Sequence, residues 1–285
     1  MNSPAPSSRD HRPLLIAEIG WNHMGDMDRA RAMIAAAAEN GADVAKFQTW
    51  SVRRLVPGEW DEDGRRQIYE QAELSREQHE LLQSTCAEHG IAFLSSACSL
   101  PDAELLRDLG VDRVKIPSPD CRNRELVGFA LENFREVMVS TGTATRAEIE
   151  SLVAMAGAAD KLTLFHCVSS YPCPPERANL PRIAELQHLH PRVGYSDHTE
   201  GIDGAVVSLG YRPVALEKHF TIDRSLPGRD NRFAILPDQL AELRRMADLA
   251  AEVNRAHGID YQEVEGAVRA NYAGRFNGPE RASHA

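Results

Sequence analysis

The sequence lacks a long apolar run, and this absence argues against a membrane-spanning helix. Such a helix needs roughly 20 consecutive apolar residues, and no run of that kind occurs in the 285 residues. Residues 1–12 are polar and lack the apolar stretch of a secretory signal peptide. We expect residues 1–12 to be a flexible segment and the protein to be cytoplasmic, with no membrane partner.

Cysteine is also scarce, and its spacing argues against a disulfide framework or a zinc ribbon. The cysteines are odd in number and show no paired C-x-x-C spacing. They are Cys86, Cys98, Cys121, Cys167 and Cys173. We expect reduced thiols, most of them serving as small buried apolar side chains.

Positive charge is in the minority. The 32 lysines and arginines face 42 acidic residues, which gives a formal net charge of −10. Without a basic stripe the chain cannot neutralise a phosphate backbone, so general nucleic-acid binding is excluded. A small phosphorylated ligand is still compatible, because a few well-positioned lysines are enough to bind it.

What the sequence does contain is one repeated pattern: a short apolar run, a polar or glycine-marked turn, and an amphipathic helical stretch. The predicted strands are 14–20, 43–49, 91–97, 113–118, 136–142, 162–168, 192–198 and 213–221, and the predicted helices are 28–40, 75–89, 101–109, 122–134, 145–158, 180–189, 202–209 and 237–257. This alternation predicts an α/β fold with parallel pairing. A chain of this length favours a single-domain (β/α)8 TIM barrel.

An open doubly wound sheet is the alternative fold. The turn after the first predicted strand reads EIGWNHMG (18–25), which is not the Gly-x-Gly-x-x-Gly turn of a dinucleotide-binding fold. We therefore expect a barrel over residues 13–260 and a polar, frayed tail over 261–285. The long polar connection 50–74 is expected to be a lid or a substrate loop.

Polar and ionisable residues gather where the predicted strands end. Glu18, Lys46, Ser96, Lys115, Ser140, Ser196, His198 and His219 all lie in such positions. Barrels carry their active sites at this rim, and so many polar groups would be costly to bury without a ligand. The sequence therefore predicts an enzyme or binding site there.

His198 and His219 end consecutive predicted strands, so a barrel brings them side by side. With Glu18, Asp197, Glu217 or Asp230 as oxygen donors, the pair suits a divalent metal. The alternative is that these histidines, like most, are simply hydrogen-bonded. Lys46 and Lys115 suit a phosphate or carboxylate, unless both form structural ion pairs.

Several short motifs together resemble the sialic acid synthase (N-acetylneuraminate synthase) family. They are IAEIGWNHMG (16–25), KFQ (46–48), KIPS (115–118), STG (140–142), HC (166–167), YP (171–172), GYSDHT (194–199), EKHFT (217–221) and PGRD (227–230). The resemblance runs from about residue 14 to residue 250 and covers the whole predicted barrel.

The resemblance implies a TIM-barrel enzyme that condenses phosphoenolpyruvate with the aldehyde of an N-acetylated hexosamine and releases phosphate. It implies that His198 and His219 hold a divalent metal, Mn²⁺ or else Mg²⁺ or Co²⁺. Phosphoenolpyruvate would be held by Lys46, Ser96, Lys115, Ser118, Ser169 and Ser196. Glu18, Asp120, Tyr171 and Asp230 would face the acceptor or the reacting centre, and Glu18 or Asp120 could guide the attacking water.

The chain also departs from the family pattern. A C-terminal antifreeze-like domain is usual in the family, and we expect it to be absent here. Asp120 stands where the family has glutamate, and Arg229 stands where it has proline. These differences leave the aldehyde acceptor open, and a homodimer is possible. The alternatives are a synthase acting on an aldose phosphate, a non-catalytic sugar-binding barrel, and a metal-dependent sugar isomerase.

Overall fold

The computed structural model describes residues 12–157 and 161–278. Of the predicted flexible segment 1–12, residues 1–11 lie outside the described residues. Arg12 is described, and its guanidinium forms an ion pair with the Asp43 carboxylate at 2.6 Å. The last part of the predicted tail, 279–285, also lies outside them.

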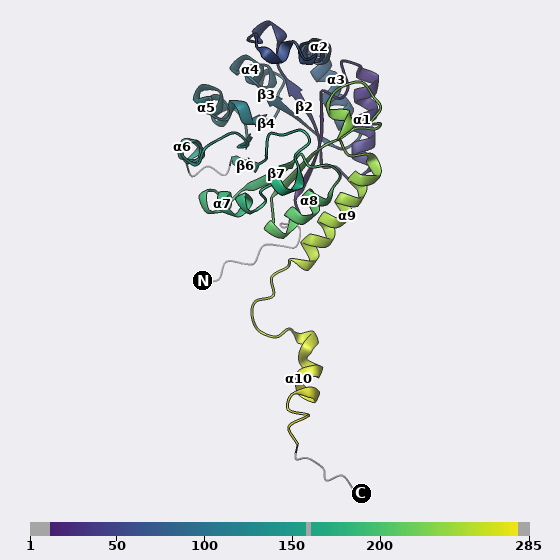
Figure 1. The fold of residues 1–285 in the computed structure, drawn as a ribbon, viewed down its shortest axis with the longest axis vertical. Coiled ribbons are helices and arrows are strands. Elements are labelled where there is room, and N and C mark those ends of the chain that lie inside the picture. Colours follow the sequence, from purple (N-terminus) through teal and green to yellow (C-terminus); the bar gives the residue numbers. More distant parts are fainter. Residues whose placement is uncertain (1–11, 158–160, 279–285) are drawn as a thin grey trace.

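The strands form a closed parallel barrel in sequence order (Figure 1). They are β1 (Leu14–Gly20), β2 (Val44–Thr49), β3 (Ala92–Ala97), β4 (Arg113–Ile116), β5 (Glu136–Ser140), β6 (Leu162–His166), β7 (Val193–Asp197) and β8 (Ala215–His219). The barrel closes through pairing of β1 with β8. This confirms the predicted TIM barrel and excludes the open sheet.

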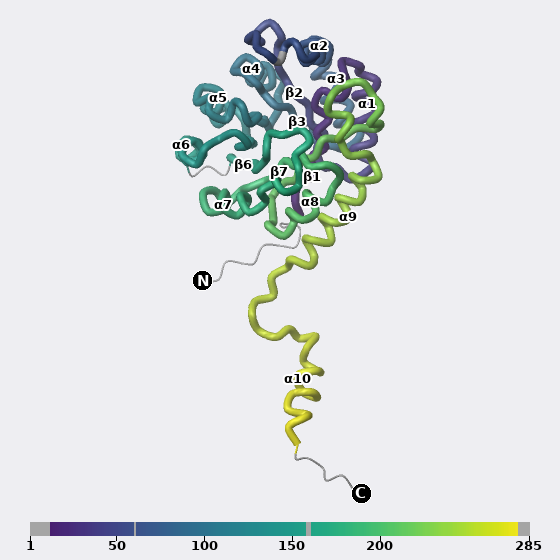
Figure 2. The backbone as a smooth tube through the Cα atoms, viewed as in Figure 1, coloured from purple at the N-terminus to yellow at the C-terminus, as the bar shows by residue number. Residues whose placement is uncertain are grey.

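Helices follow the strands and surround the barrel (Figures 1 and 2). They are α1 (Met27–Glu39), α3 (Arg76–Glu88), α4 (Leu100–Asp108), α5 (Arg124–Asn133), α6 (Arg146–Ala156), α7 (Pro181–Leu189), α8 (Asp203–Ser208) and α9 (Pro237–Val253). Local sequence sets their ends. Ser75 and Gln78 form a reciprocal capping box that begins α3. Gly41, with φ of +88°, follows the end of α1.

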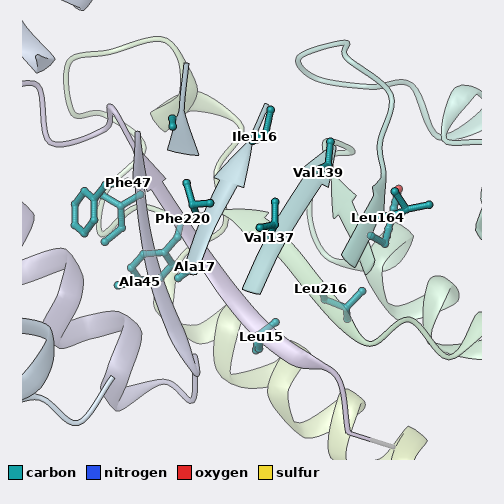
Figure 3. Packing of buried hydrophobic residues seen from close by; sticks show 14 of the residues in the cluster. Leu15, Ala17, Ala45, Phe47, Ile116, Val137, Val139, Leu164, Leu216 and Phe220 are labelled. Carbon is teal, nitrogen blue, oxygen red and sulfur yellow. The ribbon is translucent and has the colours of Figure 1, made fainter. Parts of the chain in front are cut away.

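The main hydrophobic core lies between the barrel wall and the helices. Figure 3 shows Leu15, Ala17, Ala45, Val137, Val139 and Leu216, among others, packed together on the outer face of the strands. These residues alternate along each strand with those that face the barrel interior, because successive strand side chains point to opposite faces.

A second, smaller cluster fills the interior of the barrel. Its buried members are Ile16, Val44, Leu94, Met138, Phe165 and Ala215. Moving two residues toward the C-terminal end of each strand reaches the next inward position. Those positions hold Glu18, Lys46, Ser96, Ser140, Cys167 and Glu217. Strand alternation therefore stacks a polar layer directly on an apolar plug.

Some predicted boundaries are wrong. The connection 50–74 is not a plain loop, because it contains the short turns η2 (Val52–Arg54) and η3 (Glu59–Asp61) and the helix α2 (Arg65–Ala72). The sequence pattern of α2 is weak. The helix is stabilised by Tyr69, which packs against Trp21 and Trp50 at the barrel mouth. The segment beyond α9 is not wholly frayed, since it holds η8 (Glu263–Glu265) and α10 (Gly266–Tyr272).

Two expectations drawn from absences can be compared with the structure. All five cysteines are free, and all but the half-buried Cys98 are buried. Within the part of the chain that the structure describes, no helix is both long enough and apolar enough to span a bilayer.

Candidate active site

All of the predicted site residues except Asp197 line one cavity of about 820 Å³ at the C-terminal ends of the strands. The cavity also collects side chains that follow the strands, including Asp120 after β4 and Asp230 after β8. Parallel strands in a closed barrel end at the same rim, so residues far apart in sequence meet there. The strand-end pattern predicts this location for the site residues. The role of each residue stays a prediction.

Four buried charged side chains form the floor of this cavity. Lys46 Nζ lies 2.6 Å from Glu18 Oε2 and 3.8 Å from Glu217 Oε2. Lys115 Nζ lies 2.6 Å from Glu217 Oε1. Both lysines are therefore in ion pairs, as the structural alternative for them required, yet they also face the cavity.

Burial and pairing set the protonation of these groups. Burial favours a raised pKa for Glu217, but the ammonium groups of Lys115 and Lys46 outweigh it and lower that pKa to about 2. Burial works against the charge on Lys46, and the carboxylates of Glu18 and Glu217 reverse this and raise its pKa. Burial raises the pKa of Glu18 and lowers the pKa of Lys115. Glu217 is therefore ionised at neutral pH, and Glu18 is the carboxylate that is more easily protonated.

A polar cradle surrounds Gly142, just after β5. The Gly142 N–H donates to Ser118 Oγ at 3.1 Å. A Cβ at this position would come within 2.6 Å of Ser169 Oγ, 2.8 Å of Cys167 Sγ and 2.9 Å of Ser118 Oγ. Only glycine lets these three side chains converge, and the hydroxyl groups of Ser118 and Ser169 are donors that suit an anionic oxygen.

His198 and His219 lie side by side, with ring centroids 5.7 Å apart. His198 Nδ1 is 2.7 Å from the carbonyl oxygen of Val168, so Nδ1 donates and Nε2 keeps its lone pair. Burial lowers the pKa of His198 to about 4, and burial, with the charge of His198, lowers that of His219 well below its usual range. Both rings are neutral at physiological pH.

These features fit a divalent metal, because a metal binds the neutral imidazole and the other ring nitrogen is commonly held by a carbonyl. His219 Nδ1 is buried without a hydrogen-bond partner among the described residues and lies 3.5 Å from Asp230 Oδ2. No group of three or more His, Cys, Asp or Glu side chains within those residues is arranged to hold a metal. Oxygen atoms from substrate or water would therefore complete the ligand set.

Two of the expected oxygen donors are used elsewhere. Asp197 points away from the mouth and pairs with Lys218 at 2.8 Å on the outer side of the wall. Glu217 faces the lysines and accepts a hydrogen bond from Ser196 Oγ at 3.0 Å. The expectation that Asp197 lies beside the metal is wrong, because strand alternation turns the residue before His198 outward.

A second half of the cavity, which includes the surroundings of the histidines, is aromatic and acidic. Tyr171 lies against His198, with ring centroids 4.2 Å apart and ring planes tilted by 41°. Burial, followed by the charge of Glu18, raises the pKa of Asp230 to about 7. Burial, followed by the charge of Asp102, raises the pKa of Asp120 to about 6. Both carboxyl groups can exchange protons near neutral pH, as acid–base residues require.

The sequence analysis missed other residues of this half. Trp21, Trp50 and Tyr69 form a ring cluster with centroids 5.3–6.2 Å apart and line the cavity. Gln48 Nε2 donates to Glu18 Oε1 at 2.6 Å. Period-two alternation from Lys46 would have predicted that Gln48 faces inward. The contact between Tyr69 and the tryptophans depends on helix α2, which had no clear sequence signal.

Buried lysines, hydroxyl groups and two neutral histidines at the mouth of a β/α barrel are typical of a class, the enzymes that act on small molecules at the C-terminal rim. Comparison with known proteins narrows this class. Residues 33–259 match the model of the NeuB family. The chain therefore belongs to the NeuB family.

Relatives of known name agree with this assignment. The N,N'-diacetyllegionaminic acid synthase of Campylobacter jejuni is 30% identical over 263 residues, covering 87% of this chain and 78% of that protein. The N-acetylneuraminate-9-phosphate synthase of Mus musculus is 33% identical over 271 residues, covering 89% and 74%. The crystal structure of the sialic acid synthetase of Leptospira borgpetersenii, with citrate, is 30% identical with a TM-score of 0.84, covering 92% and 93%. The chain is thus an enzyme of a family of synthases.

Proposed function

We propose that this enzyme condenses phosphoenolpyruvate with the aldehyde of a sugar, giving a nonulosonic-type 2-keto-3-deoxy acid and phosphate. The observation that carries the proposal is the arrangement of two buried lysines, a hydroxyl cradle and two neutral histidines around one cavity. The names of the relatives support the same reaction class. An isomerase would have no use for the lysines and the cradle.

Phosphoenolpyruvate would lie over the floor of the cavity. Lys46 and Lys115 would contact its carboxylate and phosphate, and Ser96 and Ser196 lie at neighbouring strand ends. The hydroxyl groups of Ser118 and Ser169, beside the Gly142 turn, would donate hydrogen bonds to phosphate oxygens. The charges of Lys46, Lys115, Glu18 and Glu217 cancel, so the charge of the substrate must be balanced by another cation. A metal or a proton on Glu18 would supply that balance.

His198 and His219 would hold a divalent metal. Mn²⁺ is the first ion to test, and Mg²⁺ and Co²⁺ are the alternatives. A metal bound there supplies Lewis-acid polarisation of the acceptor aldehyde. The hydrogen bond from His198 Nδ1 to Val168 holds the ring with its other nitrogen free for the metal. Tyr171, which contacts His198, would cover the metal side of the acceptor.

The bond changes are as follows. The double bond of phosphoenolpyruvate opens as carbon 3 bonds to the aldehyde carbon, and the aldehyde oxygen takes a proton from a protonated carboxyl group of the cavity, Asp230 or Glu18. Water adds at carbon 2 and gives one proton to a carboxylate. The bond between carbon 2 and the phosphate oxygen then breaks, the remaining hydroxyl proton leaves with the phosphate, and carbon 2 becomes the ketone. Among the carboxylates that line the cavity, Asp120, Glu18 and Asp230 are the candidates for this role. The pKa of about 6 favours Asp120 as the base that guides the water.

The acceptor class is tested directly by phosphate release from phosphoenolpyruvate with a panel of aldehydes. The panel contains N-acetylhexosamines, diacetamido-trideoxyhexoses and aldose phosphates, each with Mn²⁺. Turnover with an acylamino sugar supports the proposal. Absence of phosphate release with every aldehyde, at any of the three metals, would refute it.

An aldose phosphate is the second candidate acceptor. Arg65 and Arg229 both contact Asp63 at 3.1 Å, and both arginines line the cavity. An acceptor phosphate would bind there. Preference for aldose phosphates that disappears in Arg229→Ala would favour this reading.

We also propose that residues 13–260 form the catalytic unit, with 261–285 as a tail, and that the enzyme works in the cytoplasm as a homodimer. Free cysteines support a reducing compartment. Exposed apolar side chains beyond α9, among them Ile259, Val264 and Phe276, support self-association.

A further inference from the structure

A buried ion pair lies on the outer side of the barrel wall, next to the two candidate metal ligands. At the end of β7, Ser196 and the next residue after the strand, His198, face the cavity, and Asp197, the last residue of β7, lies between them. On β8, Glu217 and His219 face the cavity and Lys218 lies between them. Asp197 and Lys218 are only 1% and 2% exposed, and neither lines the cavity. They lie behind the wall that carries the histidines.

The Asp197 carboxylate has every lone-pair direction occupied. Its Oδ1 accepts from Tyr195 Oη at 2.9 Å and from the Thr199 N–H at 2.9 Å. Its Oδ2 accepts from Thr199 Oγ1 at 3.1 Å and from Lys218 Nζ at 2.8 Å. Lys218 also donates to the Thr199 carbonyl oxygen. A buried network that is fully satisfied in this way has one low-energy geometry.

The surrounding chain is shaped to leave room for this network. Gly204 lies in the first turn of α8, and a Cβ there would come within 2.6 Å of Thr199 Oγ1 and 3.2 Å of both Asp197 carboxylate oxygens. The helix therefore lies directly against the charged pair. Water has no access to weaken it.

The position of the pair in the sheet gives it a mechanical role. Backbone pairing of β7 with β8 runs from Tyr195 and Leu216 to Asp197 and Lys218. Asp197 and Lys218 are thus the last partners before His198 and His219. His198 is held in addition by Val168, whereas His219 Nδ1 has no hydrogen-bond partner among the described residues. The His219 backbone pairs with Glu18 on β1, and its carbonyl oxygen accepts from the Ile235 N–H at 2.8 Å. The Asp197–Lys218 pair fixes the same end of β8 on its other side, against β7.

We propose that the Asp197–Lys218 pair is a positioning device that sets the separation of His198 and His219 and thereby the metal affinity. The inference rests on the proposed metal site. Neither residue contacts substrate or metal. A loosened pair lets the two rings drift, and a binding geometry held within about 0.5 Å is what a metal site needs.

The test is metal binding without substrates, measured by titration calorimetry with Mn²⁺ and by the visible absorption of the Co²⁺ form. Asp197→Asn keeps the shape of the side chain and removes its charge, and Tyr195→Phe removes one hydrogen bond only. We expect Asp197→Asn to weaken Mn²⁺ binding about tenfold or more and to change the Co²⁺ spectrum, with a smaller effect for Tyr195→Phe. Glu136→Gln is the control, because Glu136 pairs with Arg192 and Arg113 at the start of β5, the opposite end of the barrel.

The outcomes separate the two claims. If the wild-type protein binds no metal, or if the His198→Ala variant binds metal as well as the wild type does, the proposed function fails. If the wild-type protein binds metal and the folded Tyr195→Phe and Asp197→Asn variants bind it equally well, only the positioning role is wrong. If Glu136→Gln weakens metal binding as much as they do, the effect is one of general stability and the positioning role is also wrong. Should Asp197→Asn fail to fold, Tyr195→Phe alone decides by the same measurements.

Discussion

Glu217 is the residue that most clearly joins stability to function. It neutralises Lys115 directly and Lys46 at longer range, and one of its oxygens has no hydrogen-bond partner in the described structure. Two buried ammonium groups without it would be strongly destabilising. The Glu217 carboxylate favours the charged form of both lysines, and both face the cavity, where they can bind an anion.

The first prediction follows from this arrangement. Glu217→Gln removes the carboxylate between two buried lysines and should lower the free energy of unfolding by about 3–5 kcal/mol. Chemical denaturation measures the change. Glu242→Gln, which breaks a solvent-exposed pair with Arg245, is the control and should have little effect. If Glu217→Gln lowers the free energy of unfolding no more than the control does, this account of the four buried charged side chains is wrong.

The pKa of Asp120 gives a second prediction at the residue scale. A general base must be ionised, and burial together with Asp102 raises this pKa to about 6. We expect kcat/KM to rise as pH increases through about 6 and this limb to disappear in Asp120→Asn. Asp102→Asn removes the like charge and should move the limb to lower pH. An unchanged limb in Asp120→Asn would assign the base to Glu18 or Asp230.

At the scale of elements, the loop after β5 forms the cradle proposed for phosphate. Gly142→Ala adds a Cβ within 3 Å of three polar side chains and should raise the KM for phosphoenolpyruvate about tenfold or more. Metal binding should stay unchanged, because the histidines lie on β7 and β8. Gly210→Ala, where the added Cβ meets no atom within 4 Å, is the matched control. Steady-state kinetics and calorimetry check both variants, and an unchanged KM in Gly142→Ala would remove the cradle from the phosphate site.

Elements also show how far sequence reasoning reaches. Strands β1 to β8 were predictable because each is a short apolar run between turn residues. Their inward positions followed once one interior residue was known. Helix α2 was not predictable, because its contacts are with Trp21 and Trp50 across the mouth and its own pattern is weak. The pairing of Lys46 and Lys115 with carboxylates needed the closed barrel, since Lys115 and Glu217 are 102 positions apart.

At the scale of the whole molecule, the segment beyond α9 projects from the barrel (Figure 2). Its exposed apolar side chains are typical of association surfaces. We expect Val264→Asp with Val268→Asp to shift the protein from dimer to monomer in light scattering. Asn271→Asp adds a charge to α10, the helix that carries Val268, without removing an apolar group, and should leave the dimer intact. A monomeric wild-type protein would contradict the proposal.

The whole molecule is best understood as a rigid barrel that gathers an anion site and two neutral histidines at one rim. The central claim is that these act together in metal-dependent use of phosphoenolpyruvate. The most direct measurement is phosphate release from phosphoenolpyruvate with an acceptor aldehyde, after chelation and again after Mn²⁺ is restored. We predict that chelation abolishes release, Mn²⁺ restores it, and His198→Ala and His219→Ala each lower it more than about 100-fold. Full activity in the chelated histidine variants would contradict the account.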